Sequence, residues 1–188
     1  MFTHKQKRRV PIGVPTDHGN FCIRSFRGSD QADAFSLYRL GVLGGRLDLV
    51  GEAPDMADIE KSYFRRPQDH FWIAEAGGSV IGTIAIAEDN QCVMHLRRLR
   101  VTPSWQAETR VASGLIKTAI AHARLHGCLK LVFHTALDGP RAIQLLDGLG
   151  LQFSRILDRS GQHLLEFYDD LYASLSGEGP AEPAPPAR

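Results

Sequence analysis

An apolar stripe at helical spacing, followed at once by an apolar run, is the feature that most restricts what this chain can fold into. Between residues 109 and 126, apolar side chains recur at i, i+3, i+4, i+7, i+8 and i+11, at Ala112, Leu115, Ile116, Ala119, Ile120 and Ala123. Gly127 is placed to end this helix. The near-continuous apolar run LKLVFHTAL at 129–137 is typical of a strand that is buried on both faces. Together with the strand CVMHLRRLRV at 92–101, these segments predict a β-α-β unit with parallel strands.

The segments before this unit predict a strand, two helices and a hairpin. FCIRSF at 21–26 has the composition of a strand, and Asp30 is placed to cap a helix that runs to Gly44-Gly45. A second helix is expected from Asp55 to the proline at position 67, because apolar residues recur at helical spacing. The runs HFWIAEA and SVIGTIAIAE flank a Gly-Gly pair, which is a strong hairpin signal.

The segments after the unit predict one more helix and a closing hairpin. Asp138 is placed to cap a short helix that ends at Gly150, and LQFSRIL and HLLEFYDDLY form the hairpin. The whole pattern predicts an α/β (α+β) fold: a single mixed, largely antiparallel sheet with a central parallel pair, flanked by helices.

The bulk properties of the chain bound its class. Its 188 residues suit one domain, expected at 21–175 between a disordered arm (1–20) and a disordered Pro/Ala-rich tail (176–188). No stretch approaches the roughly 20 apolar residues of a membrane span. The net charge of +1 provides no broad basic field for nucleic acid. Cys22, Cys92 and Cys128 lack metal-site spacing and the N-terminus lacks a secretory signal, so we expect reduced thiols, no metal site and a cytoplasmic location.

Two segments, taken in this order of elements, give the chain a family resemblance over about 21–172. These are HLRRLRVTPSWQ, which stands before the long helix, and PRAIQLLDGLGL, which follows the buried strand. The turn after the strand at 92–101 begins V-x-P, as Val101-Thr102-Pro103. The set resembles the GCN5-related N-acetyltransferase family. The resemblance implies the acyl-CoA N-acyltransferase fold and acetyl-CoA as the co-substrate.

The resemblance also implies where acetyl-CoA binds. In the family, a Q/R-x-x-G-x-G/A segment opens the long helix and cradles the pyrophosphate with backbone N–H groups. Aligned without a gap, that segment puts Thr109 and Val111 at the small-residue positions, whereas a one-residue insertion puts Arg110 at the glycine position. Both alignments lose the first glycine, and Arg110 could compensate by pairing with phosphate. The expected cofactor-binding residues are Leu99, Arg100, Val101, Gln106, Ala107, Glu108, Thr109, Arg110, Val111, Ala112, Asp138 and Arg141.

The catalytic residues implied by the resemblance depart from the common pattern. His95 stands where family members often carry a Glu base, and Leu146 stands where many carry a Tyr that protonates the departing thiolate. His95 and His134 are therefore the candidate catalytic residues, because imidazole exchanges protons near neutral pH. A structural role in a half-buried strand is the alternative for both. Tyr168 or Tyr172 could replace the missing acid.

Acetyl transfer from acetyl-CoA to an amine of a small molecule or a peptide is the function that the resemblance implies. The alternative is a catalytically silent protein of the same fold that binds an acyl-CoA or another ligand as a sensor or interaction module. The resemblance allows a homodimer through the closing strands. It does not name the acceptor, for which Tyr38, Tyr63, His70 and Trp72 are candidate lining residues.

Overall fold

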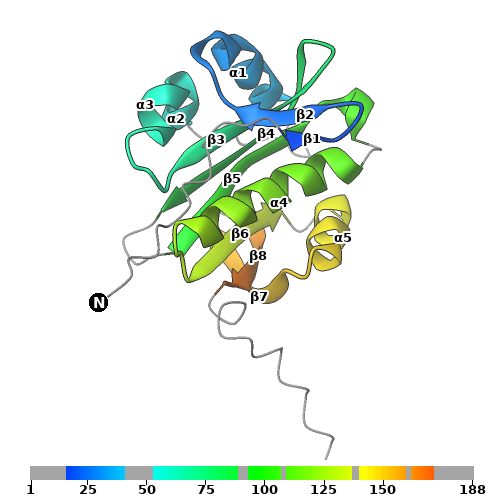
Figure 1. Ribbon diagram of the computed structural model, residues 1–188. Coiled ribbons are helices and arrows are strands. Elements are labelled where there is room, and N and C mark those ends of the chain that lie inside the picture. Colours follow the sequence, from blue (N-terminus) through cyan, green and yellow to red (C-terminus); the bar gives the residue numbers. More distant parts are fainter. Residues whose placement is uncertain are drawn as a thin grey trace, which may run out of the picture.

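One mixed sheet forms the centre of the computed structural model (Figure 1), which describes residues 16–40, 53–88, 93–106, 109–136, 140–159 and 162–171. Within these residues the sheet has eight strands in the order β1-β2-β3-β4-β5-β6-β8-β7. Only β5 and β6 pair in parallel, and the other neighbours are antiparallel. The strands are β1 Thr16–Asp17, β2 Cys22–Ser25, β3 His70–Ala76, β4 Ser79–Glu88, β5 Val93–Val101, β6 Lys130–Ala136, β7 Gln152–Arg159 and β8 Gln162–Asp170.

Helices cover both faces of the sheet and bury a separate apolar core on each. α4 (Thr109–Leu125) and α5 (Pro140–Gly148) pack on one face. α1 (Gln31–Arg39), α2 (Pro54–Ala57) and α3 (Ile59–Tyr63) pack on the other. Short 3₁₀ turns at Gly28–Asp30 and Pro103–Trp105 precede α1 and α4. Side chains of regular strand segments alternate between the two cores, as Phe71 and Trp72 do in β3.

The fold class predicted from the sequence is confirmed. The β5-α4-β6 unit forms with its strands parallel, and Gly127 ends α4 at a φ of 69°. The Gly-Gly hairpin joins β3 to β4 with Ala76 opposite Ser79, and Gly77 and Gly78 adopt φ values of 55° and 78°. Both glycines are needed here, because side chains rarely adopt a positive φ.

Three local predictions differ from the structure. The helix expected from Asp55 divides into α2 and α3, because Asp58 leaves the helical conformation and its carboxylate caps α3 by accepting a bond from the Lys61 N–H (3.0 Å). Thr16 and Asp17, which the sequence assigned to the disordered arm, pair with β2. Asp30 precedes α1 as expected, yet its carboxylate binds the Arg24 guanidinium (2.7 Å) rather than capping the helix. The remaining arm (1–15), Gly44-Gly45 and the tail lie outside the described residues.

A bulge in β5 also overturns the simple alternation expected for its arginines. Alternation would place Arg97 on the face opposite to Arg98 and Arg100. Instead the β4–β5 register shifts, and Arg98 adopts a φ of 57°. Leu96 and Leu99 therefore both enter the core beneath α4. All three arginines are left on the side of α1–α3.

A cluster of imidazole rings anchors the C-terminal half of α4 to the sheet. The His122 ring lies 5.2 Å from that of His70 in β3 and 4.1 Å from that of His126. Burial, with smaller contributions from neighbouring histidines, lowers the pKa of both His70 and His122 from 6.5 to about 4. For His122, a bond to the Gln68 carbonyl and the charge of Asp69 oppose this shift. The folded protein therefore holds these two rings neutral at neutral pH.

We predict that stability falls as the pH drops from about 6.5 towards 4. Below 6.5 the unfolded chain binds protons on these rings and the folded protein does not, so each ring removes on the order of 1–3 kcal/mol across this window. Urea unfolding at pH 7 and pH 5, at constant ionic strength, measures the effect. His70→Gln, which retains a hydrogen-bonding group next to Ser25, should flatten the dependence. Equal stability at the two pH values would contradict the prediction.

Candidate active site

The parallel pair at the centre of the sheet opens towards the C-terminal ends of its strands. β5 and β6 are paired only from Val93 opposite Lys130 to Leu96 opposite Phe133. Beyond these residues β5 continues to Val101 and β6 to Ala136, and the described residues show no further pairing between them. β5 remains paired with β4 on its other side, as far as Val101 opposite Gly82. The far edge of β5 therefore presents backbone N–H and C=O groups to the gap.

The two candidate catalytic histidines lie together at the closed end of this gap. His95 is opposite Val132 in the parallel register, and His134 is the first residue of β6 beyond the last pair. Their ring centroids are 5.9 Å apart. Both side chains lie on the sheet face opposite α4, because their strand neighbours Leu96 and Phe133 enter the core beneath that helix. The sequence predicted each residue separately, and the fold brings them together.

Glu166, which the sequence analysis did not single out, completes this group. It lies opposite His134 in the β6–β8 register, is 6% exposed, and its Oε2 is 3.0 Å from His134 Nε2. Its Oε1 accepts a bond from Arg155 Nε (3.2 Å). Burial alone would raise the pKa of Glu166, but bonds from His134, Ser154 and Arg155 outweigh it and hold that pKa below its usual value. A charged residue within the apolar run HLLEFY was the sequence signal that could have found it.

A second ionic group holds the bulge of β5. Arg98 forms a bidentate pair with Asp55 of α2, at 2.6 and 2.7 Å, and its guanidinium stacks 5.0 Å from the Tyr38 ring centroid. Tyr63 donates to the same carboxylate (2.5 Å). Burial alone would raise the pKa of Asp55, but the bonds from Arg98 and Tyr63 lower it overall. The carboxylate therefore stays ionised at neutral pH and ties α2 to β5.

Arg100 reaches the end of α1 instead of a carboxylate. Its Nε donates to the Tyr38 carbonyl (3.3 Å) in the last turn of the helix, and its Nη1 donates to the Leu99 carbonyl (2.8 Å). Burial, together with the charge of Arg98, lowers the pKa of Arg100 to about 10. A cation at a helix C-terminus is stabilised by the helix dipole, so Arg100 helps to hold the end of α1 against β5, and its predicted contact with the cofactor stays a prediction.

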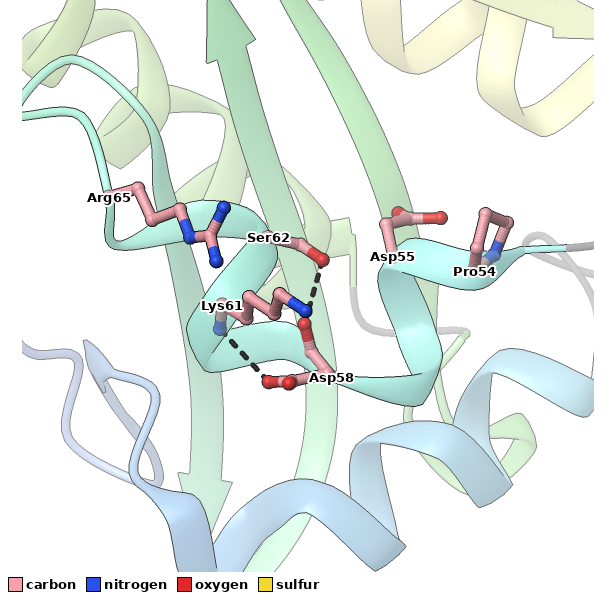
Figure 2. Close-up of a pocket in the computed structure, with 6 residues that line it drawn as sticks. All are labelled: Pro54, Asp55, Asp58, Lys61, Ser62 and Arg65. Carbon is pink, nitrogen blue, oxygen red and sulfur yellow. Dashed lines mark hydrogen bonds between the residues drawn. The ribbon is translucent and has the colours of Figure 1, made fainter.

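An open depression lies beside the Arg98–Asp55 pair, on the same side of the sheet. It has a volume of about 480 Å³ and is lined by Pro54, Asp55, Asp58, Lys61, Ser62 and Arg65. Figure 2 shows Asp55 on α2 at one side and Lys61 and Ser62 on α3 at the other. Asp58 lies between them, and its backbone carbonyl accepts a bond from Ser62 Oγ (2.7 Å). The lining carries charges of both signs.

Several of the predicted cofactor-binding residues lie in the turn before α4 or in its first residues. Gln106 donates to the Val101 carbonyl (3.1 Å) and so ties the turn back to β5. Thr109 and Arg110 are exposed in the first turn of α4, whereas Val111 and Ala112 are buried against the sheet. Leu99 and Val101 are buried in the same core. Ala107, Glu108, Asp138 and the side chain of Arg141 lie outside the described residues.

The four residues suggested for the acceptor site do not share one surface. Tyr38 and Tyr63 belong to the core beneath α1–α3, while Trp72 packs in the core beneath α4 and contacts His70. All four are at most 6% exposed, so as a set they do not line an open site. Leu146 is fully buried in α5, and Tyr168 donates its hydroxyl to Gln152 (2.7 Å).

Two features are absent from the described residues. These residues contain no cluster of three or more His, Cys, Asp or Glu side chains arranged to hold a metal ion. None of the helices in the described ranges is long and apolar enough to cross a membrane.

Solved structures share the arrangement at low sequence identity. An acetyltransferase from Streptococcus agalactiae superposes with a TM-score of 0.70 at 18% identity, covering 81% of this chain and 99% of that one. Spermidine N-acetyltransferase from Vibrio cholerae, solved in complex with CoA and spermine, superposes with a TM-score of 0.67 at 15% identity, covering 84% and 99%. At such identities the likeness establishes the fold.

Sequence comparison establishes the family. N-acetyltransferase 8 of Mus musculus is 35% identical over 103 residues, which cover 52% of this chain and 45% of that protein. The chain spans about half the length of the curated relatives it matches. Residues 44–151, more than half of the chain, match the family model described as Acetyltransferase (GNAT) family. With the open parallel pair and the helix that follows it, this match shows that the chain belongs to the GNAT family of acetyltransferases.

Proposed function

We propose that this protein is an N-acetyltransferase that moves the acetyl group of acetyl-CoA to an amine of a small molecule or a peptide. The observation that carries the proposal is the gap between β5 and β6, which leads from the exposed backbone edge of β5 to the start of α4. Backbone N–H groups near Leu99 to Val101 can bind the carbonyl of a thioester placed in this gap. When bound, acetyl-CoA supplies the activated acetyl group.

The start of α4 is suited to the pyrophosphate of that co-substrate. A helix N-terminus presents unpaired N–H groups and the positive end of the helix dipole. The first turn of α4, from Thr109, carries no acidic residue. Ala107, Glu108, Asp138 and Arg141 remain predicted contacts.

His95 and His134 are the proposed catalytic residues. An ammonium group must lose a proton before its nitrogen can attack, and His95 is placed on the face opposite α4 to accept that proton directly or through a water. The acceptor approaches from this face, on which the depression beside Asp55 is open and lined by charges of both signs. The Vibrio cholerae relative named above acts on a polyamine, which is an acceptor of the same chemical class.

The location and assembly of the protein are separate proposals. A homodimer through the closing strands is supported by Phe153 and Ile156 of β7, which are 53% and 56% exposed. Light scattering of the purified protein measures its oligomeric state. The cytoplasmic location expected from the sequence is tested by cell fractionation.

We predict that acetyl-CoA binds and that thiol release depends on an added amine. Ligand at ~100 times its dissociation constant should raise the free energy of unfolding by ~2.7 kcal/mol. Calorimetry, thermal unfolding and a thiol-release assay with amine panels measure these effects. Binding without turnover would favour the silent alternative, and the absence of binding at millimolar acetyl-CoA would refute the proposal.

For the proposed base, we predict that His95→Ala lowers kcat by roughly 10²–10⁴-fold, the usual contribution of general acid–base catalysis. The affinity for acetyl-CoA should stay near that of the wild type, and the acidic limb of the pH profile should disappear. His126→Gln is the matched control, because His126 lies at the far end of α4 and bonds the His122 carbonyl. If His95→Ala has the same kinetics as His126→Gln, His95 is a structural residue and not the base.

At the start of α4, we predict that Thr109→Gly tightens acetyl-CoA binding, because removing the Cβ lets the pyrophosphate approach the backbone more closely. The change should cost roughly 0.5–1 kcal/mol of stability, through the added entropy of the unfolded chain. Calorimetry and thermal unfolding measure the two effects.

Arg110→Gly distinguishes the two alignments of the phosphate segment. A gain in affinity in this variant would support the inserted alignment, whereas a loss would show that Arg110 pairs with phosphate. If neither substitution changes the affinity, this turn does not contact the pyrophosphate.

A further inference from the structure

The carboxylate of Glu166 is surrounded by donors. Its strand neighbours Leu165 and Phe167 face the core beneath α4, so Glu166 faces the opposite side, where His134 lies. The β7–β8 register shifts between Phe153 and Arg155, which places Ser154 in a bulge. Ser154 and Arg155 thereby both donate to Glu166, in addition to His134. One nearly buried carboxylate thus collects donors from two neighbouring strands.

This arrangement fixes which nitrogen of His134 carries a proton. An ionised carboxylate only accepts hydrogen bonds, so His134 Nε2, at 3.0 Å from Oε2, must be the donor. Nδ1 is then the atom that can exchange a proton. The His134 side chain is 22% exposed, and the residue immediately follows the last pair of the parallel strands. An oriented imidazole therefore stands at the closed end of the gap, where the paired strands separate.

We propose that Glu166 is a positioning residue that orients His134, and that His134 protonates the thiolate that leaves in acetyl transfer. This inference rests on the proposed function. It also provides the proton donor that the apolar, fully buried Leu146 cannot be. The arrangement follows a general pattern in which a carboxylate orients a histidine that transfers protons.

The proton balance of the reaction is satisfied by the two histidines. The amine nitrogen forms the new C–N bond and the C–S bond of the thioester breaks. An acceptor that arrives as an ammonium ion loses two protons in all, while the sulfur gains one and one goes to solvent. His95 accepts the first proton before attack and releases it to solvent, and it accepts the second once the C–N bond has formed, while His134 Nδ1–H gives a proton to the sulfur. The rings are 5.9 Å apart between centroids, a separation that one water can bridge, so the proton on His95 can restore the imidazolium of His134.

Glu166→Gln tests the inference, because it keeps the shape and removes the charge. We expect kcat to fall roughly 10–100-fold, less than the 10²–10⁴-fold of a residue that itself transfers the proton, with little change in acetyl-CoA affinity. The proton of His134 should no longer be confined to Nε2, since the ionised acceptor is gone, while the acidic limb of the pH profile stays in place. Glu75→Gln is the matched control: it breaks the Arg24–Glu75 ion pair on β2 and β3, at the opposite side of the sheet, and should behave as the wild type.

Two further measurements keep the test decisive. In a double-mutant cycle with His134→Gln, the double variant should be no slower than His134→Gln alone, because the two residues act as a unit. ¹⁵N NMR of the imidazole should show His134 protonated at Nε2 in the wild type. Additive losses, or a Glu166→Gln variant with the kcat and the His134 tautomer of Glu75→Gln, would overturn the inference.

Failure of this inference is distinguishable from failure of the proposed function. An active wild type in which His134→Gln keeps its kcat and basic limb overturns the inference alone, and this variant decides the matter if Glu166→Gln does not fold. A wild type that neither binds acetyl-CoA nor acetylates any amine refutes the proposed function and the catalytic role of His134 with it.

Discussion

The left-handed backbone of Arg98 is the local constraint on which the rest of the site depends. A side chain at positive φ costs about 1–3 kcal/mol, so the surrounding structure must hold it in place. Thr83 Oγ1 donates to the Arg98 carbonyl (2.8 Å), and Asp55 and Tyr38 bind its guanidinium. The resulting bulge bends β5 where its pairing with β6 ends. The gap between the strands therefore follows from a single residue that three neighbours hold in a strained conformation.

The alternation of strand side chains then sorts the chemistry onto one face of the sheet. Leucine, methionine and phenylalanine residues of β5, β6 and β8 enter the core beneath α4 and α5. The intervening positions carry His95, His134 and Glu166, and the bulge adds Arg98 to the same face. Polar groups that reach the gap are thus separated from the apolar wall that supports it. The imidazoles are therefore carried by a rigid sheet and lie on its accessible face.

The sequence predicted those parts of the fold that carry a local signal, such as apolar residues at regular spacing. It missed the parts that depend on one residue or on a partner far away in the chain. The helix at 109–126 and the Gly77-Gly78 hairpin carry their signals within a few residues. In the sequence, the only sign of the bulge is that Leu96 and Leu99 are three positions apart, whereas core residues of a regular strand are two apart. This signal is weak, because other apolar residues surround it. His95 and His134 could be named because each lies in a recognisable strand. The role of Glu166 could not, because its partners His134 in β6 and Arg155 in β7 lie 32 and 11 residues away along the chain.

The ion pairs of this protein have different roles. Arg24 pairs with Asp30 and Glu75, and so joins the 3₁₀ turn before α1 to β2 and β3, far along the sheet from the gap. Burying such charges costs about as much as their attraction returns, so the pairs near the gap need a reason beyond stability. The Arg98–Asp55 pair holds a strained backbone. The His134–Glu166 pair holds an imidazole whose other nitrogen can exchange a proton, and an apolar pair at these positions would support the sheet equally well. The proposed proton transfer would account for this pair at the place where the gap begins.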